Sequence, residues 1–278
     1  MTIDAVENTV GVRLSLEAIK VPILPRVALQ LMTMVDDENA DATRLSALIH
    51  GDPGLAAHVM RISNSVAYGG RYPTTHLSQA VTRLGRKLLR EVAVIAAVAD
   101  SVFRVKGFRR EAEQMWYRSL ALAVWSRELA HLTETPTETA FLNGMILEIG
   151  RPVVLREAAN ACDDLGIKLD PALLSALIER YHQPVGVRIA ETWRLPETVR
   201  ACITYVDAPD EAGPDAQNVL LVATARLIVD AFRSEDEVHA EDVIYHPFFD
   251  LLGIDRQDAR RLVMRHADID EAVESLAI

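Results

Sequence analysis

Apolar positions recur along most of this chain at steps of three and four residues, which is the period of an α-helix with one buried face. Val27, Leu31 and Met34 follow this period in one segment, and Leu55 and Val59 follow it in another. No segment alternates apolar and polar residues over the length of a strand. The pattern therefore predicts an all-α fold.

Short polar and turn-forming residues divide the pattern into separate helices. Asp41, Asp52 and Asp170 each stand where a side-chain oxygen can cap a helix N-terminus, and Pro follows the second and third of them. Gly85 interrupts an otherwise apolar helical segment, so we expect a break or bend there. Further helices are predicted at 115–132, 184–193, 196–206, 215–232 and 255–266.

A basic segment with a central glycine, RVKGFRR at 104–110, separates two groups of predicted helices. We expect it to be the boundary between two lobes. The predicted organisation is an N-terminal helical lobe at 1–110, a second helical lobe at 111–213, and a C-terminal helical extension at 214–278 that packs on the second lobe.

Composition narrows the class of protein. Half of the 278 residues are hydrophobic and a quarter are charged, as in ordinary globular proteins. The formal net charge of −11 disfavours nucleic acid as a partner, because a phosphate backbone would be repelled. Cys162 and Cys202 have no CxxC spacing and are predicted to be buried thiols. With no leader-like or membrane-length apolar run, we expect a soluble, cytoplasmic protein without a membrane partner.

The sharpest enzyme motifs are absent, since nothing matches GxSxG, GxGxxG, GxxxxGK[ST], HExxH or CxxC. Two Glu-x-x-His spacings occur, Glu128 to His131 and Glu179 to His182, and such pairs can serve di-metal helical bundles. Pairs at this spacing are also common on solvated helix faces, and His131 falls in the last turn of its helix. We therefore favour a solvated face over a metal site.

The stretch 45–64 has the helix, glycine turn and second helix of a DNA-reading unit. Its second helix offers only His58 and Arg61 as long polar side chains, too few for base and phosphate contacts. Two short packed helices are the favoured interpretation.

Two neighbouring segments are candidates for an interaction surface. One is a loop with Asn64, Ser65 and Tyr68, for which the alternative is a simple helix C-cap and turn. The other is a basic cluster, for which the alternative is a solvated face or ion pairs with the abundant acids. The cluster consists of Arg83, Arg86, Lys87 and Arg90.

Several separated motifs resemble the HDOD family, whose name marks an HD-hydrolase-related output domain of bacterial signalling. They include LSALIHGDPGLAAHVMRISNSVAYGG, THLSQAVTRLGRKLLREVAV, GMILEIG, IERYHQPVG and ETWRLPETVRACITY, and the resemblance covers about 19–209. It implies that the second lobe is HD-like and that the chain works in signal output.

The resemblance also implies a degenerate metal site. Related HD phosphohydrolases surround metal ions with histidines and aspartates, including an adjacent His-Asp pair. In this chain that pair falls on Leu147 and Glu148, and the first histidine falls on Arg118. The remaining family positions fall on His182, Val206, Asp207 and Arg226. No metal, cofactor or catalytic residue is therefore expected.

Glu148 lies in the segment NGMILEIGRP, among apolar residues between Gly144 and Gly150. A buried carboxylate without a partner is costly, so we expect an arginine to neutralise it, with Arg118 the leading candidate. Arginine stays charged in proteins and suits this role.

The expected function is a non-catalytic signalling adaptor that binds other signalling proteins. Two alternatives remain open. One is a phosphohydrolase with a metal site rebuilt from Glu148, His182 and Asp207. The other is a sensor that binds a nucleotide or other anion through Arg118 and Arg226.

Overall fold

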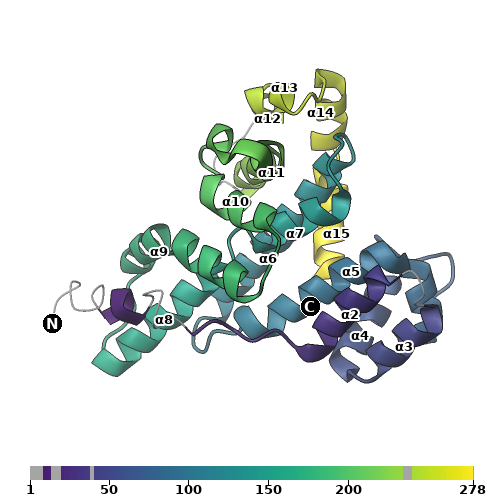
Figure 1. Ribbon diagram of the computed structural model, residues 1–278, viewed down its shortest axis with the longest axis horizontal. Coiled ribbons are helices and arrows are strands. Elements are labelled where there is room, and N and C mark those ends of the chain that lie inside the picture. The colour runs from purple at the N-terminus through teal and green to yellow at the C-terminus, as the bar shows by residue number, and fades with distance from the viewer. Residues whose placement is uncertain (1–8, 14–19, 38–40, 234–239, 278) are drawn as a thin grey trace.

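The computed structural model describes residues 9–13, 20–37, 41–233 and 240–277. Helices and their connecting turns make up these ranges, and no strand occurs within them. The predicted all-α fold class is confirmed. Figure 1 shows α2 to α5 as one group of helices and α8 with α9 as another, on either side of α6 and α7.

The first group consists of α2 (Arg26–Asp36), α3 (Ala42–His50), α4 (Pro53–Ser63) and α5 (Leu77–Val102). The first three pack against α5. Asp41 caps α3 by accepting a hydrogen bond from the backbone N–H of Arg44 at 2.8 Å, and Asp52 caps α4 in the same way from Leu55 at 3.1 Å. Both predicted caps are confirmed.

The helix α5 is kinked at the position that the sequence indicates. Gly85 has φ 69° and ψ 173°, a backbone conformation that only glycine adopts without strain, whereas the residues on both sides are helical. The first half of α5 therefore follows a different direction from the long apolar second half.

The second group consists of α6 (Arg109–Ala130), α7 (Thr137–Ile146), α8 (Gly150–Leu165), α9 (Pro171–Thr192) and α10 (Glu197–Tyr205). We predicted a helix beginning near Pro184, which is wrong, because α9 continues through this proline without a break. Asp170 caps α9 as expected, by accepting from the backbone N–H of Ala172 at 3.0 Å and of Leu173 at 3.1 Å.

The rest of the chain contains a 3₁₀ segment (Pro209–Asp215), α11 (Ala216–Arg233), α12 (Ala240–Ile244), α13 (Pro247–Leu251), α14 (Arg256–Val263) and α15 (His266–Leu276). The predicted helix at 255–266 corresponds to α14, which is shorter, and the separate α15 follows it. Both α11 and α15 pack against α6.

The middle of α6 is enclosed on all sides. Residues 119–126 are buried without interruption, although a helix at a protein surface would expose part of every turn. The second half of α5 also belongs to the same continuous hydrophobic cluster, which extends from Val10 to Ala277. The core therefore crosses the predicted boundary at 110.

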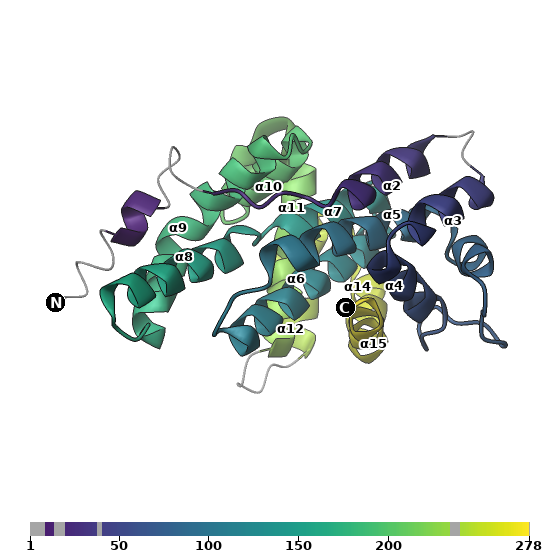
Figure 2. The same ribbon diagram turned by 90° about the horizontal axis from the view of Figure 1, so that it is seen from below.

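A segment near the N-terminus crosses the second group before it reaches α2, as Figure 2 shows. The indole Nε1–H of Trp193 donates to the carbonyl oxygen of Pro22 at 2.8 Å, and Arg156 Nη2 donates to that of Lys20 at 3.2 Å. Residues assigned to the first lobe thus contact the second. The division into 1–110, 111–213 and 214–278 stays a prediction.

Candidate functional site

The turn between α7 and α8 carries Leu147 and Glu148. Two glycines beside it allow its backbone to lie in close contact with neighbouring helices. A Cβ atom on Gly144 would lie 2.5 Å from the carbonyl oxygen of Leu122 in α6. A Cβ atom on Gly150 would overlap the carbonyl oxygen of His182 in α9. Only glycine permits both approaches, so the GMILEIG motif places Glu148 between α6 and α9.

Arg118 of α6 clamps the Glu148 carboxylate with two hydrogen bonds. Its Nε donates to Oε2 at 2.6 Å and its Nη2 donates to Oε1 at 2.9 Å, in the paired geometry that suits guanidinium and carboxylate. The Glu148 side chain is only 6% exposed. Arg151 Nε lies 3.1 Å from Oε2 but is not aligned for a hydrogen bond, so it contributes charge alone. The expected neutralisation of Glu148 by Arg118 is confirmed.

The same arginine extends the cluster to α11. Arg118 Nη1 donates to Asp230 Oδ1 at 2.6 Å. Arg226 lies one helical turn before Asp230, and its Nη2 donates to Asp207 Oδ1 at 2.5 Å. Gln183 of α9 donates to the other oxygen of Asp207 at 3.2 Å. Both predicted arginines are therefore engaged by carboxylates.

The pKa of Glu148 reflects a competition between burial and pairing. Burial alone would raise this pKa, but the hydrogen bonds and charge of Arg118, with the charges of Arg151 and His182, hold it below its ordinary value. The carboxylate is therefore ionised at neutral pH. The pKa of Arg118 is raised in turn, because its two carboxylate partners outweigh the effect of its burial.

The other predicted positions offer few metal ligands. Leu147 and Val206 are buried hydrocarbon side chains in the core, at 3% and 4% exposure. His182 is half-buried, and its Nδ1 lies 2.8 Å from the carbonyl oxygen of Ile178 one turn earlier. Within the ranges that the structure describes, no three His, Cys, Asp or Glu side chains converge as metal ligands would.

Two charged members of this cluster were not found from the sequence, namely Arg151 and Asp230. Asp230 lies 112 residues from Arg118 along the chain, so no local pattern links them. The signals that could have found them are their spacings, since Asp230 follows Arg226 by four residues and Arg151 follows Glu148 by three.

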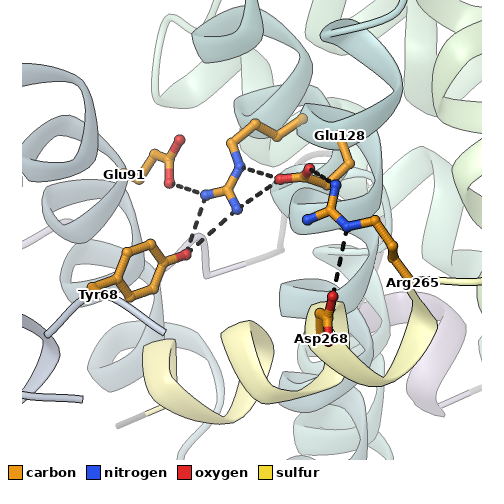
Figure 3. A network of polar contacts seen from close by, with 6 residues as sticks. Tyr68, Glu91, Glu128, Arg265 and Asp268 are labelled. Atoms are coloured by element: carbon orange, nitrogen blue, oxygen red, sulfur yellow. Dashed lines mark hydrogen bonds and ion pairs between the residues drawn. The ribbon is translucent and has the colours of Figure 1, made fainter. Parts of the chain in front are cut away.

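A second buried network surrounds Arg127, which lies in the last turn of α6, nine residues after Arg118 (Figure 3). Arg127 Nη1 donates to Glu91 of α5 at 2.8 Å, and both terminal nitrogens lie 3.4 Å from the Tyr68 hydroxyl. Arg127 also donates to Glu128 from Nε at 3.2 Å and from Nη2 at 3.1 Å. One guanidinium thus joins the α4–α5 loop, α5 and α6.

The network continues into the C-terminal region. Glu128 Oε2 lies 4.0 Å from Arg265 Nη1, and Arg265 Nε lies 3.6 Å from Asp268 of α15 (Figure 3). These outer pairs are more exposed and weaker than the bond between Arg127 and Glu91. Side chains from all three predicted regions nevertheless meet at this point.

Glu91 and Glu148 are both buried, but their pKa values shift in opposite directions. Burial raises the pKa of Glu91 to about 6, because the attraction of Arg127 only partly offsets the loss of hydration and the repulsion of Glu128 and Glu138. Glu148 receives two aligned hydrogen bonds from its arginine, whereas Glu91 receives one. The additional hydrogen bond at Glu148, together with neighbouring positive charges where Glu91 has neighbouring carboxylates, accounts for the opposite directions of the two pKa shifts.

The candidate loop is held together by its own side chains. Asn64 Oδ1 accepts from the backbone N–H of Thr74 at 2.7 Å, and Asn64 Nδ2 donates to the Thr74 carbonyl oxygen at 3.0 Å. Ser65 Oγ donates to the carbonyl oxygen of Ile62 at 2.8 Å. With Tyr68 turned toward Arg127, these three side chains support the loop from within.

The basic cluster also makes contacts within the chain. Arg83 donates to the carbonyl oxygens of Ser63 at 2.9 Å and Tyr72 at 2.7 Å. The remaining members are likewise engaged: Arg86 Nη2 donates to Asp37 O at 2.5 Å, Lys87 pairs with Glu138 at 3.1 Å, and Arg90 has a partner. The loop and cluster form a braced platform whose tip exposes Val66, 81% exposed, and Tyr72, 70% exposed.

The alternative of a DNA-reading helix gains no support from α4. His58, one of its two long polar side chains, is only 4% exposed, and burial with the nearby charge of Arg61 lowers the pKa of His58 to about 3. A neutral, buried imidazole cannot contact a phosphate.

None of the described helices combines the length and the apolar character needed to cross a bilayer.

Comparison with known proteins supplies the family context. The HDOD domain family model matches residues 21–209. An uncharacterized protein of Treponema pallidum (strain Nichols) is 23% identical over 210 residues, which cover 70% of this chain and 40% of that protein. The chain therefore spans less than half the length of this curated relative.

Solved structures with the same fold cover nearly all of this chain. An HDOD domain protein of unknown function from Geobacter sulfurreducens aligns with a TM-score of 0.71 and 22% identity, over 97% of this chain and 99% of that one. A candidate phosphohydrolase from Shewanella amazonensis SB2B gives 0.69 and 23%, over 99% and 100%. A candidate signal transduction protein from Marinobacter aquaeolei VT8 gives 0.69 and 21%, over 98% and 64%. At these identities the likeness establishes the fold.

Proposed function

This chain belongs to the HDOD domain family, and from that premise we propose that it is a non-catalytic signalling protein that acts by binding other proteins. The name of the Marinobacter aquaeolei structure, a candidate signal transduction protein, agrees with a signalling role. The proposal has two parts, the lack of metal-dependent catalysis and the presence of a protein-binding surface.

The bidentate clamp of Arg118 on Glu148 carries the first part. A carboxylate that binds a catalytic metal must present an oxygen to the ion, but both oxygens of Glu148 accept hydrogen bonds from one guanidinium. Displacing Arg118 would leave a permanent cation beside a divalent ion, which is electrostatically unfavourable. This arrangement supports a structural role for Glu148.

The remaining residues at the family positions do not fit a divalent metal either. Leu147 and Val206 have no donor atom, and Asp207 accepts a hydrogen bond from Arg226. A two-metal phosphohydrolase needs several neutral imidazoles and free carboxylates around one point. These residues therefore do not support the phosphohydrolase activity that the name of the Shewanella amazonensis structure suggests for that protein.

An anion sensor at the same place is also less well supported. Its two arginines, Arg118 and Arg226, already pair with Glu148, Asp230 and Asp207. A phosphate would have to compete with carboxylates that the fold holds in place, so little positive charge remains for a ligand.

The exposed tip of the α4–α5 loop supports the second part of the proposal. Val66 and Tyr72 are large apolar side chains at the surface, and hydrogen bonds of Asn64 and Arg83 brace the loop that carries them. Preformed apolar side chains surrounded by polar and basic groups are typical of protein contacts.

The catalytic part can be tested with the purified full chain. With Mn²⁺ or Mg²⁺ we expect no hydrolysis of p-nitrophenyl phosphate or bis(p-nitrophenyl) phosphate above the blank, and no stoichiometric bound metal by elemental analysis. Asp207→Asn serves as the diagnostic variant, because Asp207 is 66% exposed and its replacement should not disturb folding. Metal-dependent turnover that this variant abolishes would overturn the proposal.

The binding part can be tested by placing a photo-crosslinking amino acid at Val66 in the native cell. We expect a covalent adduct with another protein from this position. Leu251 is a matched control, since it is also a large exposed apolar residue, at 65%, in the C-terminal region. The same adducts from both positions, or none from Val66, would contradict a binding surface at the loop.

A further inference from the structure

A cavity of about 560 Å³ lies where α5 ends and α6 begins, away from the Glu148 cluster and from the Arg127 network. Its volume is within the range of small-molecule sites. The residues that line it come from both helices and the connection between them: Ala99, Phe103, Arg104, Val105, Lys106, Arg109, Ala112, Glu113 and Trp116.

The wall of this cavity is aromatic. Phe103 and Trp116 pack edge to face with ring centroids 5.1 Å apart, and each is less than a tenth exposed. Ala99 and Ala112 add small side chains, so a flat apolar group could approach the rings. Such a wall favours the aromatic or hydrocarbon part of a ligand.

The rim of the cavity is basic. The segment 104–110 carries four cations and no acid, although the whole chain has a net charge of −11. Arg109 is paired with Glu113 at 2.6 Å, whereas Lys106 makes no ion pair within the ranges that the structure describes. The local excess of positive charge is therefore available to an anion at Lys106.

The helix α6 begins at this rim without a side-chain cap. Phe108 occupies the N-cap position and has no side-chain oxygen that could accept from the first turn of this 22-residue helix. Uncapped backbone N–H groups and the positive end of the helix dipole attract anions. The cations and the aromatic wall line one cavity, and α6 begins at its rim with Arg109.

We propose that this cavity binds a small organic anion, with an aromatic or apolar body against Trp116 and Phe103 and an acidic group at Lys106 and the start of α6. Because α5 and α6 both line it, such a ligand would contact the two predicted lobes at their junction. The site uses none of the residues that carry the proposed function.

The test compares 1-naphthalenesulfonate with the uncharged 1-naphthalenemethanol on the full chain. We expect the sulfonate to bind about tenfold more tightly, as a gain of about 1.4 kcal/mol implies. The chain has three tryptophans, so ¹⁵N spectra can assign each indole N–H by single substitution. The sulfonate should shift the Trp116 signal and leave those of Trp125 and Trp193 in place.

Two charge reversals on the same connection complete the experiment. Lys106→Glu should remove the preference for the sulfonate. Arg110→Glu is the matched control, because Arg110 is exposed and carries the same charge but does not line the cavity. Equal effects of the two variants, an unshifted Trp116 signal, or equal affinity for the two probes would each overturn the proposal. If the chain did hydrolyse the phosphate substrates, the proposed function would fail, but this binding result would stand, since neither probe can be hydrolysed.

Discussion

Replacing Arg118 by methionine is expected to lower the free energy of unfolding by about 3–5 kcal/mol at neutral pH. The substitution keeps most of the side-chain length but leaves the carboxylate of Glu148 buried without its two hydrogen bonds. Adding Glu148→Leu should restore much of the loss, because the buried charge is then removed as well. Chemical denaturation of the wild type, the single variant and the double variant measures both effects.

The loss of stability caused by Arg118→Met should become smaller at acidic pH. Arg118 holds the pKa of Glu148 below its ordinary value of 4.5, so the stabilisation is present above that value and is lost as the pH falls below it. The gap between the wild type and Arg118→Met should therefore narrow on acidification.

The control for this substitution is Arg261→Met. Arg261 pairs with Asp258 at 3.1 Å, but both side chains are well exposed, so the expected change is within about 0.5 kcal/mol. If Arg118→Met and Arg261→Met cost the same, or if Glu148→Leu deepens the loss, the clamp is not a buried ion pair of the kind described.

Replacing Gly150 by alanine is expected to cost about 3 kcal/mol or more, since the new methyl group would overlap backbone atoms of α9. The nearest atom is the carbonyl oxygen of His182, which cannot turn aside as a flexible side chain could. The helices α8 and α9 would have to separate at their crossing. Thermal and chemical denaturation should both report the loss.

Gly54→Ala is the matched control for this prediction. Gly54 lies in the exposed first turn of α4, where an added methyl group would meet only the Asp52 side chain at 3.4 Å. An alanine in a helix usually stabilises by about 0.5–1 kcal/mol relative to glycine. A Gly150→Ala variant as stable as Gly54→Ala would show that α8 and α9 do not approach this closely.

Features that depend on a few neighbouring residues could be predicted from the sequence. Asp41, Asp52 and Asp170 cap their helices because the bonds they accept come from residues two or three positions on. Gly85 kinks α5 through its own backbone conformation. In each case the cause lies within one helical turn, so no knowledge of the tertiary structure was needed.

Pro184 shows where local reasoning fails. A proline inside a helix removes one backbone hydrogen bond, and this favours a break. The helix α9 packs against α8 and α10, and it has buried residues both before and after Pro184, so we attribute its continuity to packing that outweighs the lost bond. Intrinsic preference is a weak guide where tertiary contacts are extensive.

The candidate site was predictable only in part. The partner of Glu148 followed from the cost of burying a lone charge, which selects an arginine without knowledge of the fold. The family resemblance supplied the positions of Arg118 and Arg226. The contact between Arg118 and Asp230 joins residues 112 positions apart, and the network around Arg127 joins three regions, so both required the folded structure.

The hydrophobic core that encloses α6 extends beyond 21–209, the stretch that the family model matches. Residues 119–126 have no outward face, and α11 and α15, which lie beyond residue 209, cover part of this helix. A fragment cut at that point would expose hydrocarbon from the centre of the molecule and deprive Arg118 of Asp230. We therefore expect a chain cut after residue 209 to lose one layer of its hydrophobic core.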